Sequence, residues 1–207
     1  MNYFEFKKTI EDLPFFETRE LRLVFGNKFT GSMLVNLKNW VNKGHLIMLR
    51  RGLYVVAEEV KKSDMMTFAT KLYQPSYVSM EMALHFYGII PEAVFTVTSV
   101  TTRKTKTFNT ILGNFSYQKI KKEAFGGYET KNNGKISFNL AVPEKAIVDF
   151  LYLNRNVLNG DPEQFQGYRF HTDFQFDVKK LLHFSEAFQN KKVVLLTKNF
   201  IKYYVAS

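Results

Sequence analysis

The order of the periodic patterns along the chain predicts an α+β fold. Segments with helical spacing of apolar residues and segments that alternate apolar and polar residues follow one another without the regular strand–helix–strand repeat of a parallel sheet. The 207 residues, 45% of them hydrophobic, are enough for one large domain or two small ones. Because a charged stretch at residues 57–64 separates two apolar parts, we expect two domains, residues 1–60 and residues 61–207.

The first domain is expected to contain three helices followed by a hairpin. Gly44 lies where a helix C-terminal cap is expected, and Gly52 supplies the positive φ of a tight turn. The expected elements are helices over residues 4–13, over 18–25 with Thr18 as N-cap, and up to 43 with Thr30 or Ser32 as N-cap, then strands over 46–49 and 53–56. Three helices and a terminal hairpin are the elements of a winged helix-turn-helix.

The second domain is expected to mix helices and strands. Pro75 closes its first helix, Ser79 is a good N-cap, and Pro143 suits the first turn of a helix. The expected elements are helices over 64–73, 80–87 and 143–153, strands at 94–100 and 136–142, and a hairpin of strands 108–112 and 115–120 around Gly113-Asn114. The pattern leaves the type of the segments 179–189, 193–197 and 200–205 open.

Charge in the first domain predicts a polyanionic partner. Residues 21–57 contain six Lys or Arg and no Asp or Glu, in a chain whose net charge is +10. On the third helix, Leu34, Leu37, Trp40 and Val41 are assigned to the core, and the opposite face is polar. The alternative for that polar face is an ordinary solvated surface. The candidate DNA-binding residues are Ser32, Asn36, Asn39 and Lys43 on the helix, and Arg50 and Arg51 at the tip of the hairpin.

A second window without acidic residues spans Val94 to Lys122. Its cations form a possible second basic surface: Arg103, Lys104, Lys106, Lys119, Lys121 and Lys122. The sequence leaves three interpretations open, namely contacts with phosphate, contacts with an acidic protein surface, and a solvated sheet edge protected by lysines.

The patterns of catalytic and metal sites do not favour an enzyme. Clustered carboxylates with a lysine are typical of nucleases, and Glu81, Glu144, Lys145 and Asp149 supply those residue types, but without the usual strand-borne spacing. Glu81 and His85 are four residues apart on the same predicted helix. They form either an exposed polar pair or part of a functional surface. The four histidines lack metal-ligand spacing, and the absence of cysteine excludes disulfides. We expect no enzymatic activity, no cofactor and no metal.

The chain also lacks the patterns of membrane proteins. Its first residues have no basic start followed by a long apolar core, and no apolar run approaches the length of about 20 residues that spans a bilayer. We therefore expect a cytoplasmic protein with no membrane partner.

Several of these segments together resemble the AbiEi family of antitoxins, which belong to type IV toxin–antitoxin and abortive-infection modules of bacteria. The order and spacing of the matching pieces carry the resemblance, and they cover roughly residues 29–153. The pieces are Leu49–Tyr54, Tyr77–Glu92, Thr96–Phe108, Gly113–Tyr117 and Ala141–Ala146.

The resemblance implies an N-terminal winged helix that represses its own operon by binding double-stranded DNA at the promoter, and a C-terminal antitoxin domain. The implied partner is a toxin resembling a nucleotidyltransferase, which is opposed in this family through its action rather than by a tight inert complex. Two alternatives come from other classes. One is a stand-alone winged-helix regulator whose second domain binds a ligand or mediates dimerisation, and the other is a nuclease-like enzyme.

Overall fold

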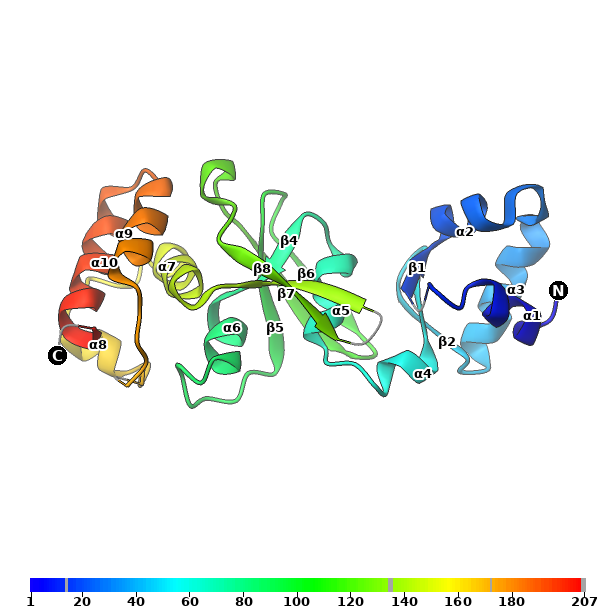
Figure 1. Ribbon diagram of the computed structural model, residues 1–207, viewed down its shortest axis with the longest axis horizontal. Helices are drawn as coiled ribbons and strands as arrows, with labels where there is room; N and C mark the ends of the chain where they lie inside the picture. The colour runs from blue at the N-terminus through cyan, green and yellow to red at the C-terminus, as the bar shows by residue number, and fades with distance from the viewer. Residues whose placement is uncertain (14, 134–135, 172, 206–207) are drawn as a thin grey trace.

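The computed structural model of the protein describes residues 1–13, 15–133, 136–171 and 173–205. The α+β prediction is confirmed, since helices and two separate sheets alternate irregularly along the chain. The molecule is elongated. An N-terminal unit lies at one end, a six-stranded sheet in the middle, and the C-terminal helices at the other end (Figure 1).

The N-terminal unit contains the predicted helices and hairpin, and one strand that the sequence did not predict. Its elements are α1 (Tyr3–Thr9), β1 (Phe15–Glu17), α2 (Thr18–Phe25), η1 (Gly26–Lys28), α3 (Gly31–Asn42), β2 (Leu46–Arg50) and β3 (Leu53–Val56). The first helix ends at Thr9, earlier than predicted, because the chain turns at Ile10 to bring β1 alongside β3. The N-cap of α2 is Glu17 rather than Thr18, and its N–H donates to Glu20 Oε2 over 2.6 Å.

Both faces of the sheet β1-β3-β2 are covered by apolar packing. Phe16, Leu46 and Val56 join the core formed by the helices of the N-terminal unit, whereas Phe15 and Val55 join the core of the rest of the protein. The predicted domain boundary at residue 60 falls at the end of the short helix α4 (Ala57–Val60). Apolar packing therefore continues across that boundary through the outer face of this sheet.

The second part of the chain forms a mixed six-stranded sheet in the order β6-β7-β5-β4-β9-β8. α5 lies on the face turned towards the N-terminal unit, and α6 and α7 lie on the opposite face (Figure 1). The elements are α5 (Met66–Leu72), β4 (Ser76–Val78), α6 (Met80–Phe86), β5 (Thr96–Thr101), β6 (Lys106–Thr110), β7 (Gly113–Lys119), η2 (Lys122–Ala124), β8 (Tyr128–Asn133), β9 (Ile136–Ala141), α7 (Pro143–Leu153), α8 (Pro162–Gln166), α9 (Val178–Ala187) and α10 (Lys191–Tyr204).

Several details of this part differ from the prediction, which did not include β4, β8 and α8. Thr110 pairs with Gly113, so the hairpin turns at Ile111 and Leu112, before the predicted Gly113-Asn114. The unassigned segments 193–197 and 200–205 lie largely within the single helix α10.

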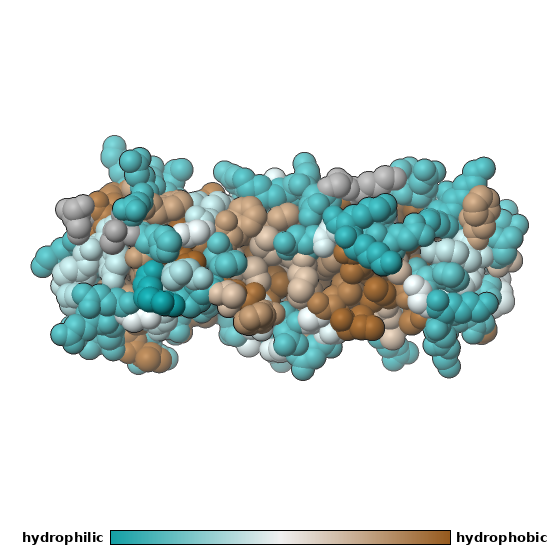
Figure 2. Space-filling view, turned by 90° about the horizontal axis from the view of Figure 1, so that it is seen from below, coloured by the Kyte–Doolittle hydropathy of each residue, from teal (hydrophilic) through white to brown (hydrophobic). Residues whose placement is uncertain are grey.

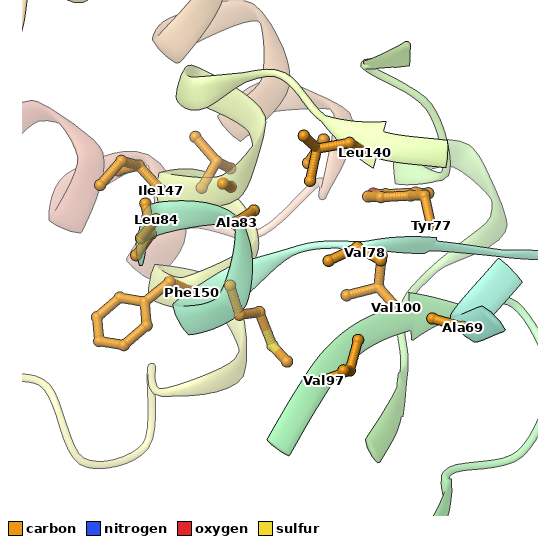
Figure 3. Close-up of a cluster of buried hydrophobic side chains, with 14 of the residues drawn as sticks. Ala69, Tyr77, Val78, Ala83, Leu84, Val97, Val100, Leu140, Ile147 and Phe150 are labelled. Atoms are coloured by element: carbon orange, nitrogen blue, oxygen red, sulfur yellow. The ribbon is translucent and has the colours of Figure 1, made fainter. Parts of the chain in front are cut away.

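The main core covers both faces of the six-stranded sheet, with α5 on one face and α6 and α7 on the other. Figure 3 shows Val78, Val100 and Leu140 of the sheet near Leu84 of α6 and Ile147 of α7, all buried. The first turn of α6 is tied to the sheet by Thr98 of β5, whose hydroxyl donates to the carbonyl of Ser79 and accepts from the N–H of Met82. Within the described residues, no helix is long and apolar enough to cross a membrane.

Candidate nucleic-acid interface

Helix α3 is rotated about its axis relative to the prediction. Met33, Leu37 and Trp40 are buried, but Leu34, which was assigned to the core, is 44% exposed. The indole of Trp40 decides the rotation, since it packs 4.5 Å from the ring of Phe6. With 100° per residue, burial of Met33 and Trp40 leaves Leu34 at the edge of the buried face.

The outward face of α3 therefore differs in part from the predicted one. The side directly opposite the core carries Val35, which is 58% exposed, and the exposed Lys38 and Asn42. Of the predicted residues, Asn39 borders this side and is exposed. The other three lie nearer the flank of the helix: Ser32 and Lys43 are exposed and Asn36 is half-buried.

The two arginines at the tip of the hairpin have different environments. Arg51 is exposed beside Gly52, whose φ of 79° makes the predicted tight turn. Arg50 Nη2 lies 2.8 Å from Glu17 Oε1, and its Nε donates to the carbonyl of Leu72 over 3.0 Å. Arg50 is thus not the free cation that the sequence predicted, because its guanidinium ties the hairpin to the second part of the chain.

The structure brings Arg50 together with two residues of the second predicted basic surface in one cavity of about 420 Å³. We call it the basic interdomain cleft. Its lining residues are Glu17, Arg19, Arg50, Lys71, Leu72, Tyr73, Gln74, Arg103, Lys106 and Phe108. Five of these side chains are cationic and one is a carboxylate.

Charge in this cleft is unbalanced. Glu17 pairs with both Arg19, at 2.6 Å, and Arg50. Among the described residues, no ion pair includes Lys71, Arg103 or Lys106. Cations that converge on a cleft attract anions strongly, because the low-dielectric walls focus their field.

Aromatic rings hold two of the cleft's cations in place. The guanidinium of Arg103 lies 4.5 Å from the centre of the Tyr73 ring and donates to the carbonyl of Gln74 over 3.0 Å. Lys106 Nζ lies 4.7 Å from the centre of the Phe108 ring. These contacts orient the positive charges without neutralising them.

The remaining cations of the second basic surface do not line the cleft. Lys104 is exposed, and its carbonyl accepts from the hydroxyl of Tyr73 over 3.1 Å. Lys119 is exposed at the end of β7. Lys121 and Lys122 are exposed at η2, which packs against α9 on the side of the sheet away from the N-terminal unit. The predicted surface is therefore divided between two regions.

The carboxylates and lysine of the nuclease alternative do not form an accessible cluster. Lys145 and Asp149 form an ion pair one helical turn apart, but their side chains are only 1% and 0% exposed. Asp149 Oδ2 also accepts from Tyr77 over 3.0 Å and from Ser79 over 2.7 Å. Burial lowers the pKa of Lys145 and raises the pKa of Asp149. This network joins α7 to β4 and the start of α6.

The other two acidic candidates also lie elsewhere. The buried Glu144 accepts from the backbone N–H of Asp177 over 3.0 Å, and Glu81 lines a separate apolar cavity. The part of the chain that the structure describes contains no group of three His, Cys, Asp or Glu able to hold a metal ion.

The chain matches no protein-family model, and no curated protein matches it. The resemblance to the AbiEi antitoxins thus rests on the sequence motifs alone.

Proposed function

We propose that the protein is the antitoxin of a type IV toxin–antitoxin module and represses its own operon by binding DNA. The observation that carries the DNA-binding half is the basic interdomain cleft beside the N-terminal unit, whose residues 21–57 contain no Asp or Glu. Cations from two distant parts of the sequence meet there with a single carboxylate. A surface of this kind binds phosphate with little dependence on base sequence.

Base recognition is assigned to α3. The order of elements in the N-terminal unit, three helices with a strand between the first two and a hairpin after the third, supports a winged helix-turn-helix. In helix-turn-helix proteins the second helix of the motif enters the major groove. Asn39 is exposed on α3, and an asparagine amide pairs with the edge of adenine. Arg51, exposed at the hairpin turn, is assigned to phosphate.

The experiment that tests this assignment compares Asn39→Ala with Asn156→Ala, which removes an exposed amide after α7. On promoter DNA from upstream of the gene, Asn39→Ala should weaken binding by about 1–3 kcal/mol, while binding to random duplex changes little. Asn156→Ala should leave both affinities unchanged. Equal losses on promoter and random DNA would exclude base readout by Asn39.

The antitoxin half of the proposal is supported by the resemblance to the AbiEi family. Its test is co-expression with the product of the adjacent gene, which should resemble a nucleotidyltransferase and arrest growth when it is expressed alone. The full chain should restore growth, and Asn39→Ala should restore it equally well if repression and neutralisation are separate activities. Failure of the full chain to restore growth would remove the antitoxin function and leave the DNA-binding proposal standing.

A further inference from the structure

An apolar cavity of about 520 Å³ lies in the second domain, away from the basic interdomain cleft. It opens between α6, the start of β5 and the segment before Phe170. Figure 2 views the molecule from the underside of Figure 1, where α6 lies, and shows apolar side chains reaching the surface over the middle of the molecule. The lining residues are Glu81, Leu84, Ile90, Glu92, Ala93, Val94, Phe95, Thr96, Thr98, Phe150, Gly167, Tyr168 and Phe170.

The aromatic wall of this cavity is built by packing between α7 and the segment that follows α8. The ring of Phe150 lies edge-on to Tyr168 at 4.8 Å and to Phe170 at 5.8 Å. The N–H of His171 donates to the carbonyl of Ile89 over 2.8 Å, which holds this segment beside the residues that follow α6. Cavities of this size and apolar character are typical of small-molecule sites, in which a few polar groups fix the ligand.

Glu81 is the charged group of this cavity that has no counter-charge. Its side chain is half-buried in the first turn of α6, and the ion pairs of the described residues do not include it. His85, one helical turn later, is exposed, so the predicted polar pair is not formed as an ion pair. Burial raises the pKa of Glu81, which is the expected effect of apolar surroundings on a carboxylate.

Thr98 and the second carboxylate of the lining, Glu92, are already engaged. The hydroxyl of Thr98 donates to the carbonyl of Ser79 over 2.7 Å and lies 3.0 Å from the N–H of Met82. Glu92 is paired with Arg169, whose Nη2 lies 2.6 Å from Glu92 Oε1. Glu81 is therefore the carboxylate left for a ligand.

We propose that this cavity binds a small organic cation with an aromatic or aliphatic body and an amine head group that pairs with Glu81. The apolar and aromatic lining removes the body of the ligand from water, and the ammonium supplies the counter-charge that Glu81 lacks. Aromatic rings in the wall favour a cation over an anion as well. The site is separate from the proposed DNA interface and does not depend on it.

The test uses two probes with the same indole body and opposite charge, tryptamine and indole-3-propionate, in equilibrium dialysis with the full chain. Tryptamine should bind at least about tenfold more tightly, because a hydrogen-bonded charge pair in a desolvated site is worth at least that factor. Methyl NMR signals of Leu84, Ile90 and Val94 should shift on addition of tryptamine.

Two matched variants locate the charge that is responsible. Glu81→Gln keeps the shape of the side chain and should abolish the preference for tryptamine. Glu92→Gln removes a carboxylate that is already paired with Arg169 and should keep that preference. Equal binding of both probes to the wild type, no saturation by tryptamine, or methyl shifts elsewhere in the protein would overturn the proposal. Binding of a Trp-Lys dipeptide without binding of tryptamine would assign the cavity to a protein side chain and overturn it too.

Discussion

The basic interdomain cleft predicts a measurable salt dependence of DNA binding. Lys71 and Lys106 line this cleft and have exposed side chains outside the ion pairs of the described residues. If each contacts a phosphate, Lys71→Ala/Lys106→Ala should flatten the slope of log affinity against log salt by about 1.8, because each contact contributes about 0.9. Between about 50 and about 200 mM salt, the advantage of the wild type over the variant should then shrink by about tenfold.

The assay is fluorescence anisotropy with promoter DNA and with random duplex over that salt range. The control, Lys198→Ala/Lys202→Ala, removes the same charge from exposed positions of α10, at the end of the molecule far from the N-terminal unit (Figure 1). An unchanged slope for the cleft variant, or an equal change in the control, would refute the reasoning. A third variant, Lys121→Ala/Lys122→Ala, shows whether the DNA path extends to η2.

Three further predictions concern stability. Asp149→Asn leaves the ammonium of Lys145 buried without a counter-charge and should lower the free energy of unfolding, measured in urea, by about 3–5 kcal/mol. The double variant Asp149→Asn/Lys145→Met should lose less. Equal losses in the single and the double variant would contradict the pairing of Lys145 with Asp149. Because the pKa of Glu81 is raised above 4.5 in the folded protein, the folded state binds the extra proton, and the wild type should lose stability relative to Glu81→Gln as the pH rises through the raised value. A difference in melting temperature between the wild type and Glu81→Gln that does not change with pH would argue against the raised pKa of Glu81. The fragment Met1–Glu59 should melt below the full chain by circular dichroism, since it lacks the packing over the outer face of its sheet, and an equal melting temperature would show that this packing adds no stability.

Periodicity predicted α7 well and missed several other elements. The helix from Pro143 to Leu153 was predicted to the residue, because a proline marks its first turn and apolar residues repeat along its length. β1 has three residues and β8 is polar after Tyr128, so neither has the apolar alternation by which a strand is recognised. The lysine and asparagine at 198–199 interrupt the apolar pattern of α10, which obscured a single helix.

The candidate site was predictable by residue type more than by arrangement. The windows without acidic residues indicated which lysines and arginines could bind an anion, and local composition was enough for that prediction. Which cations converge depends on how the N-terminal unit packs against the second part of the chain, and the partners of Arg50 lie 33 and 22 residues away in the sequence. The rotation of α3 was missed for a similar reason, because the packing of Trp40 against α1 is a tertiary contact.

The sheet β1-β3-β2, which is packed on both faces, also restricts how the two parts of this chain can recombine during evolution. Alternate residues of β3 serve different cores, with Val55 on one side and Val56 on the other. A recombination event that joined residues 1–60 to a new C-terminal partner would leave the face of Val55 uncovered unless that partner brought a complementary apolar surface. The two parts of this chain are therefore expected to pass through evolution as a single heritable block, although the sequence changes character between them.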